Sequence, residues 1–194
     1  MNCLIIYSHP NPASFNHAIK EALVKSLKEK GKNVRTRDLY AMRFDPVLKA
    51  DDFETLSRDK TPRDIEIEQE HIRWADVLVF IYPIWWAGMP AITRGYVDRV
   101  LIKGFAYEET PQGSKGLLQA KKVYIINTMG APLSVYEEMG IFKAMDMIYD
   151  QQLFGFCGFK VLGHKYFGSV QSVSDEERKQ MLAEIDGIVA GFEG

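Results

Sequence analysis

Two tryptophans in a short loop are the residues of this chain best suited to hold a planar group. The apolar run 77–82 stops at Pro83, Trp85 and Trp86 follow at once, and Pro90 opens the next segment. Open α/β sheets bind ligands beyond the carboxyl ends of their strands. An aromatic loop in that position offers flat surfaces and backbone amides to a ring. The same tryptophans also suit a subunit interface, where this residue type is enriched.

A second loop, residues 8–16, follows the first predicted strand and leads into a helix. The free amides and partial positive charge of a helix N-terminus favour a phosphate, and His9, Ser14 and Asn16 add side-chain donors. An ordinary capped helix with a proline-rich lead-in explains the same residues.

A third loop, residues 127–136, contains Thr128 and Gly130, which allow close approach of a ring. Tyr136 in this loop is either a proton donor or a packing residue. Because the three loops meet at one edge of the predicted sheet, they predict a single site for a planar group that carries phosphate, with a flavin as the first candidate.

Several common sites are excluded by their missing motifs. The sequence has no GxGxxG, no GxxxxGK[ST], no HExxH and no GxSxG. The four histidines show no metal-ligand spacing, so we expect no metal site. Cys3 and Cys157 lie in apolar surroundings and are interpreted as small buried hydrophobes.

Composition points to an ordinary globular protein. The formal charge of −2 over 194 residues gives no reason to expect nucleic acid or an anionic membrane as partner. The N-terminus lacks the features of a signal peptide, and the most apolar window, 74–92, is broken by charge, glycine and proline. We expect a cytoplasmic protein without stable membrane insertion.

Apolar periodicity predicts alternating strands and helices. The predicted strands are 4–7, 33–38, 77–82, 122–127 and 160–167, and the predicted helices are 16–30, 51–56, 62–75, 91–101, 137–151 and 174–192. The acidic residues Asp64, Glu66, Glu68 and Glu70 are interpreted as a solvated helix surface. This order predicts an α/β fold of flavodoxin-like type, with a five-stranded parallel sheet in the order 2-1-3-4-5 and helices on both faces. We expect residues 1–194 to form one flavin-binding domain.

The chain resembles the flavodoxin-fold NAD(P)H:quinone oxidoreductases, the DT-diaphorase-like flavoproteins, and especially their short bacterial-type members. The matching segments run through most of the chain in order: His9-Pro10, Ser14-Phe15-Asn16, 38–42, Ala75-Asp76, 83–91, 95–100, 104–107, 128–130 and 157–162.

The resemblance implies roles for residues in all three loops. The flavin phosphate or pyrophosphate is held by His9, Ser14, Phe15 and Asn16. The isoalloxazine ring is bordered by Pro83, Ile84, Trp85, Trp86, Thr128, Met129 and Gly130, with backbone amides facing its polar edge. Tyr136 lies near the nicotinamide and quinone, and Arg178 lies near the adenine end of FAD.

Two departures from the family pattern affect the ring pocket. The larger members have a histidine six residues after the tyrosine, whereas this chain has Phe142 there, so a tyrosine–histidine relay does not carry over. The loop from Gly130 to Tyr136 is one residue longer, and Met129 replaces a glycine.

The resemblance also implies the activity, which is two-electron transfer from NADH or NADPH through the flavin to a quinone-like acceptor in ping-pong order. It implies FAD, with FMN as the alternative, and a homodimer whose subunits share each site. Two other functions stay open: an electron carrier of flavodoxin type, which the low charge disfavours, and a flavin-binding regulatory subunit, for example of a membrane transporter.

Overall fold

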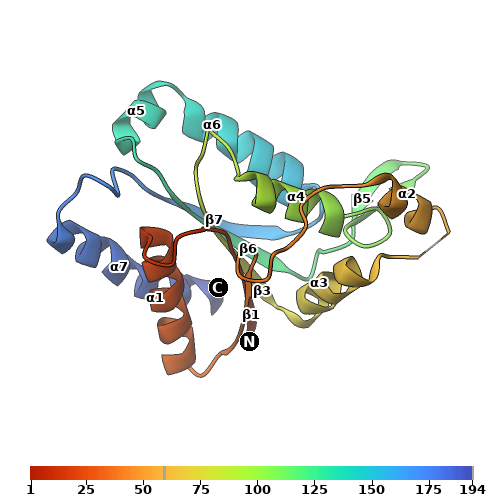
Figure 1. Cartoon of the computed structure of the whole chain (residues 1–194), viewed down its shortest axis with the longest axis horizontal. Coiled ribbons are helices and arrows are strands. Elements are labelled where there is room, and N and C mark those ends of the chain that lie inside the picture. Colours follow the sequence, from red (N-terminus) through yellow and green to blue (C-terminus); the bar gives the residue numbers. More distant parts are fainter. Residues whose placement is uncertain (59, 194) are drawn as a thin grey trace.

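The computed structural model describes residues 1–58 and 60–193, and Figure 1 shows a central sheet with helices on both sides. Its five parallel strands lie in the order β2-β1-β3-β6-β7. They are β1 (Asn2–Tyr7), β2 (Asn33–Asp38), β3 (Val77–Pro83), β6 (Lys122–Thr128) and β7 (Lys160–Phe167). With β6 and β7 counted as the fourth and fifth strands, this is the predicted order 2-1-3-4-5, so the flavodoxin-like fold is confirmed.

Helices cover both faces because consecutive strand residues point to opposite sides. The helices are α1 (Phe15–Glu29), α2 (Ala50–Leu56), α3 (Arg63–Trp74), α4 (Ala91–Val100), α5 (Leu133–Glu138), α6 (Ile141–Met145), the π-helix η1 (Asp146–Gly155), α7 (Asp175–Ala190) and the 3₁₀-helix η2 (Gly191–Glu193). Cys3 and Ile5 of β1 share a core with α1 and α7, whereas Leu4 and Ile6 share a core with α3, α4 and η1. The continuous apolar runs of β1 and β3 are buried on both faces, as parallel sheets require.

The strand register aligns the loops that were expected to bind a ligand. Pro83 pairs with Thr128, and Thr128 pairs with Phe167, so β3, β6 and β7 end side by side. On the other side of β3, Ile81 pairs with Tyr7 at the end of β1. The segments after these strands therefore leave the sheet from one edge.

The helix predicted at 137–151 is wrong in its boundaries. The chain forms α5 first, then turns at Gly140, whose φ of 69° lies in the left-handed region. It continues as α6 and then as η1, which runs to Gly155. Apolar spacing alone does not distinguish a π-helix from an α-helix, and the left-handed turn divides the pattern.

Two further differences concern the α3/α4 side of the sheet. The polar loop after α4 contains a small antiparallel hairpin, β4 (Tyr107–Thr110) and β5 (Gly113–Gly116). Glu68 is buried rather than solvated, because its carboxylate accepts hydrogen bonds from Arg37 Nε at 3.0 Å and from the Tyr96 hydroxyl at 3.3 Å. Within the described residues, no helix has both the length and the apolar character needed to cross a membrane.

Candidate flavin site

One depression of about 350 Å³ lies where β1, β3 and β6 end. All but two of the residues expected to bind a cofactor line it: His9, Ser14, Phe15, Asn16, Pro83, Ile84, Trp85, Thr128, Met129 and Gly130. The exceptions are Trp86 and Arg178. The three loops predicted to meet do meet at this depression.

The loop after β1 is ordered by short-range hydrogen bonds. Asn11 Oδ1 accepts from the Ala13 amide at 2.8 Å, and the Asn11 carbonyl accepts from the Ser14 amide at 3.1 Å. Ser14 caps α1 by accepting from the His17 amide at 3.2 Å. These contacts fix the first turn of α1 beside the depression, where its partial positive charge favours an anion.

Asn16 has the one buried side-chain acceptor in the described lining without a hydrogen-bond partner. Its side-chain amide is within 2.6 Å of Thr128 Oγ1, while the buried Oδ1 is unpaired. A hydroxyl both donates and accepts, so Thr128 satisfies either orientation of this amide. Rotation of the amide by 180° would turn its two N–H donors to the unpaired side. This is the donor chemistry that a phosphate or ribityl oxygen requires.

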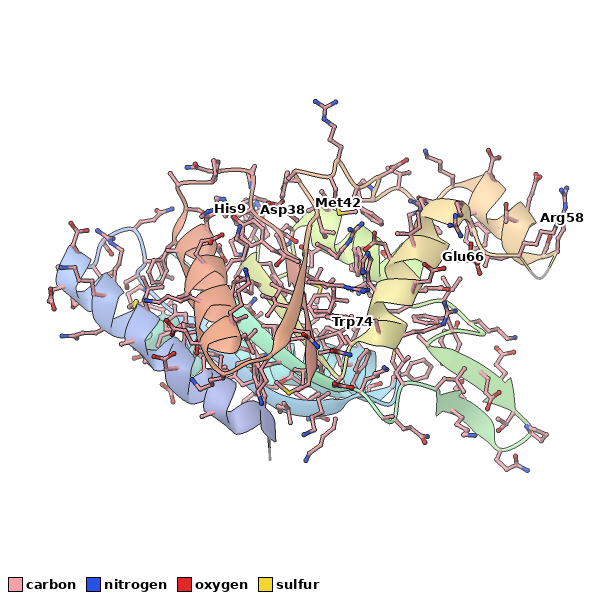
Figure 2. The ribbon with its side chains drawn as sticks, turned by 90° about the horizontal axis from the view of Figure 1, so that it is seen from below. His9, Asp38, Met42, Arg58, Glu66 and Trp74 are labelled. Atoms are coloured by element: carbon pink, nitrogen blue, oxygen red, sulfur yellow. The ribbon has the colours of Figure 1, made fainter. Side chains whose placement is uncertain are left out.

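His9 forms the boundary between the first two loops. Its Nδ1 lies 3.1 Å from the Asn11 amide nitrogen and 3.2 Å from the Asn11 carbonyl oxygen, so Asn11 holds the ring in either tautomer. Burial lowers the pKa of His9, partly offset by the Asn11 carbonyl. The ring lies 6.1 Å from that of Trp85, and Figure 2 shows His9 at the same edge as Asp38, where β2 ends. Nε2 of His9 is the ring nitrogen left for a ligand beside the aromatic loop, and it is a donor when Nδ1 accepts from Asn11.

The loop after β3 makes a tight reverse turn. Trp85 and Gly88 exchange two backbone hydrogen bonds, of 3.1 and 3.0 Å, across Trp86 and Ala87. Both central residues have positive φ, 51° and 56°, which is typical of a type I′ turn and unusual for residues other than glycine and asparagine. Trp85 faces the depression, whereas Trp86 is fully exposed, with a relative exposure of 103%.

The loop after β6 is joined to its neighbours on both sides. The Thr128 carbonyl accepts from the Ile84 amide at 2.8 Å, and the Met129 amide donates to the Phe167 carbonyl at 2.9 Å. These two amides are therefore engaged within the chain. The Gly130 amide has no partner among the described residues and is available to a ligand at the depression.

Tyr136 lies on α5, outside the residues that line the depression. Its ring packs 5.7 Å from that of Phe142, next to a cluster that contains Ile84 and Met129. Phe142 in turn packs 4.2 Å from Tyr166. The tyrosine thus lies beside the wall of the depression and packs against Phe142, the residue that excludes a tyrosine–histidine relay.

A second depression of about 510 Å³ adjoins the first. Ala13, Ser14, Phe15 and Val170 line both. Arg178 lines only the second, and its guanidinium donates to the Val170 carbonyl at 2.8 Å and to Asp175 at 2.9 Å. The N-terminal turn of α1 therefore lies between two connected compartments.

Four lining residues were missed by sequence reasoning: Asn11, Ala13, Val170 and Gln171. The first two lie in a loop already assigned to the site. Val170 and Gln171 follow β7. They could have been predicted, because the fifth predicted strand ends at the same sheet edge as the fourth.

Comparisons with known proteins agree with this geometry. A family model described as "Flavodoxin-like fold" matches residues 1–189. A Haemophilus influenzae protein named "Uncharacterized NAD(P)H oxidoreductase" is 38% identical, over 94% of this chain and 91% of its own. The "NAD(P)H dehydrogenase [quinone] 1" of Rattus norvegicus is 34% identical, over 92% of this chain and 73% of its own.

A solved structure gives the same relationship in three dimensions. The NAD(P)H:quinone oxidoreductase of Methanothermobacter marburgensis superposes with a TM-score of 0.87 at 27% identity, covering 99% of this chain and 98% of that one. The chain therefore belongs to the flavodoxin-fold family of NAD(P)H:quinone oxidoreductases.

Proposed function

We propose that this protein is an FAD-dependent oxidoreductase that transfers two electrons from NADH or NADPH to a quinone or a similar acceptor. The observation that carries the proposal is the pair of adjoining depressions on either side of the N-terminal turn of α1. Relatives with quinone reductase names support the reaction type.

The residues present fit a flavin. The first depression has an aromatic wall at Trp85, a free amide at Gly130 and the unpaired amide oxygen of Asn16. The turn of α1 that holds Ser14 and Phe15 suits a pyrophosphate. The second depression, with Arg178 beside it, provides room for an adenosine, and for this reason we favour FAD over FMN.

When bound, the flavin would supply hydride chemistry, from NAD(P)H to the acceptor, in ping-pong order. The protein's own part is to orient and to hydrogen-bond. The indole of Trp85 would border the flavin ring. The Gly130 amide would donate to negative charge that develops on that ring. Tyr136, in its place beside Ile84 and Met129, would donate its hydroxyl proton in a hydrogen bond to the acceptor carbonyl.

We also propose that the active form is a homodimer. Exposed apolar residues lie on α5 and the turn after it, on η1 and in the tryptophan turn: Trp86, Leu133, Val135, Met139, Met147 and Ile148. Large exposed apolar residues of this density are typical of protein interfaces. A partner subunit on this side would complete the wall of the ring pocket.

We also propose that the enzyme is cytoplasmic and that residues 1–194 form one domain; the two free cysteines support only the first of these. Cys3 and Cys157 are free and buried, as predicted. Burial raises the pKa of the Cys3 thiol to about 12 and that of Cys157 to about 11. Both thiols are therefore inert packing groups rather than nucleophiles.

Steady-state oxidation of NADH and NADPH with menadione tests the activity, with Tyr136→Phe as the variant. Loss of one hydrogen bond in the transition state, worth about 1.4 kcal/mol, would lower turnover about tenfold. Tyr40→Phe, which changes a residue of a separate depression, is the matched control and should leave turnover unchanged. No NAD(P)H oxidation with any quinone would refute the enzyme, and unchanged turnover in Tyr136→Phe would remove only the tyrosine's role.

A further inference from the structure

A cluster of three ligand-type side chains lies beneath η1, away from the residues that line the two depressions. Asp146 and Asp150 lie one turn apart on η1, and His164 comes from β7. His164 Nδ1 is 3.0 Å from Asp150 Oδ1 and 3.9 Å from Asp146 Oδ1. One ligand atom from each of the three side chains lies within 4.8 Å of the others.

The hydrogen bonds around His164 determine which nitrogen faces the aspartates as an acceptor. Asn127 Nδ2 donates to the Tyr82 carbonyl at 3.1 Å, so Asn127 Oδ1 is left to accept from His164 Nε2 at 2.7 Å. The neutral ring then carries its proton on Nε2, and the Nδ1 lone pair points at the carboxylates. A metal-binding histidine is oriented in this way, through a hydrogen bond from its second nitrogen.

The cluster contains more acceptors than donors. With the ring neutral, Nδ1 and the two carboxylates all accept, and the Tyr166 hydroxyl is the one donor to them among the described residues, 3.0 Å from Nδ1 and 3.1 Å from Asp146. No lysine or arginine forms an ion pair with either aspartate in the described part of the chain. The side chain of His164 is only 4% exposed, so water compensates this side poorly.

A second observation at this place is an unsatisfied buried hydroxyl. The Tyr82 side chain is fully buried, and its hydroxyl has no hydrogen-bond partner among the described residues. Burial raises the pKa of Tyr82, the nearby Asn127 side chain lowers it in part, and Tyr149 and Asp150 raise it further. A buried hydroxyl without a partner, next to a cluster rich in acceptors, is typical of a place where a cation or its bound water belongs.

We propose that Asp146, Asp150 and His164 bind a divalent transition-metal ion of the zinc class. Nitrogen and carboxylate ligands lie about 2.0–2.2 Å from Zn²⁺. At such lengths, the 3.0 and 3.9 Å separations correspond to ligand–metal–ligand angles of roughly 90° and 135°. Two carboxylates and a neutral imidazole balance the ion's charge, and Asp146, 49% exposed, gives it a path from solvent.

The expected role of the ion is to tie η1 to β7. The same helix carries Tyr149, which packs in one cluster with Ile84 and Met129. Its hydroxyl lies 3.1 Å from the position that a Cβ on Gly88 would take, so η1 touches the tryptophan turn. A metal at this cluster would therefore hold a wall of the ring pocket without contacting the ring. π-Helical segments are frequent at functional sites.

Metal binding is measured on the full chain after treatment with a chelator. Zn²⁺ is titrated by calorimetry, and Co²⁺ is followed by its visible d–d bands. We expect about one equivalent per chain and a rise in melting temperature with Zn²⁺. Asp146→Asn with Asp150→Asn should weaken Zn²⁺ binding by more than the roughly 10- to 100-fold typical of an outer-shell partner.

Glu29→Gln with Asp186→Asn, which removes two exposed carboxylates elsewhere, is the control and should bind like the wild type. Equal Zn²⁺ affinity in the cluster variant and the control would overturn the site. A wild type that binds no Zn²⁺ would also overturn it, as would nitrogen NMR signals of His164 that show protons on both ring nitrogens and do not move on Zn²⁺ addition. Because apo protein is used, failure here leaves the proposed oxidoreductase function untouched.

Discussion

The loops after β1 and β3 face the same depression but are built in opposite ways. In the β1 loop, Asn11 and Ser14 satisfy the local amides, and the helix cap is regular. In the β3 loop, Trp86 and Ala87 take left-handed backbone angles and the larger side chain stands in solvent. The first loop is stable as it stands, whereas the second holds a conformation that the chain alone does not favour.

The difference indicates which interactions stabilise each loop. Left-handed backbone at residues other than glycine costs about 1–2 kcal/mol per residue, and strain of this kind persists where function uses it. We infer that the β1 loop is preorganised for a phosphate. We also infer that the β3 turn is stabilised by groups outside the chain, namely the flavin ring against Trp85 and the partner subunit against Trp86.

Trp86→Ala tests the exposed side of this comparison and has the largest expected effect. A tryptophan at the centre of an interface contributes about 2–4 kcal/mol of binding free energy, so the dimer dissociation constant should rise at least about 30-fold. The stability of the monomer should change by less than about 0.5 kcal/mol, since the side chain has no contacts to lose. Sedimentation velocity over a concentration series measures the dissociation constant. Trp74→Ala, which removes a ring that packs against Arg35, should instead lower the stability of the monomer and leave the dimer dissociation constant unchanged.

Asn16→Ala tests the ordered side. It removes the 2.6 Å contact and leaves the buried Thr128 hydroxyl without a partner, so the flavin-free protein should lose about 1–3 kcal/mol of unfolding free energy. Flavin affinity should fall as well. Urea denaturation measures the first effect. Asn33→Ala, whose bond to Asn2 is exposed, should lose less than about 0.5 kcal/mol, and equal losses in both variants would contradict a special role for Asn16.

Ala87→Gly tests the strain itself. Glycine relieves the left-handed backbone at φ 56° but adds entropy to the unfolded chain, so a net gain of about 0.5–1 kcal/mol is expected. The same substitution at Ala183, in the helical interior of α7, should destabilise by about 1 kcal/mol. Thermal melts of the flavin-free protein measure the sign of the stability change in both variants. A loss of stability in Ala87→Gly would show that the turn is not strained.

The smallest expected effect is a pH dependence from His9. Burial lowers the pKa of this residue below its ordinary value of 6.5, so the unfolded chain binds more protons just below pH 6.5. Stability should therefore fall as the pH falls through that range. The ring is partly exposed, and its share should be at most about 0.5 kcal/mol. His9→Asn should flatten the slope of denaturation free energy against pH, and an unchanged slope would argue against a buried, neutral ring.

Much of the fold was readable from sequence because local and global preferences agree. The strands 33–38 and 160–167 begin and end as predicted, and Ser174 caps α7 with Glu177 completing the capping box. What failed depends on contacts between distant segments. Glu68, expected on a solvated surface, is buried because Arg37 lies opposite. No prediction was made for Arg99, which is buried because Asp52 and Asp64 reach it from two other helices.

The site divides in the same way. Loops that end parallel strands must share an edge, so their residues were predictable together. The sequence gives no sign that, of two adjacent tryptophans, Trp85 lines the depression and Trp86 points to solvent, because that depends on the signs of two φ angles. Nor does it show that His164 lies against Asp146 and Asp150, since β7 and η1 meet only in the folded sheet.

Identification of the flavin released from the purified protein by denaturation tests the central claim most directly. Chromatography of the supernatant should give about one FAD per chain, and FAD affinity should be weaker in Arg178→Ala, whose side chain lines only the second depression. A protein that stays colourless after reconstitution with FAD would contradict the account, and one that retains FMN alone would contradict the assignment of the second depression to an adenosine.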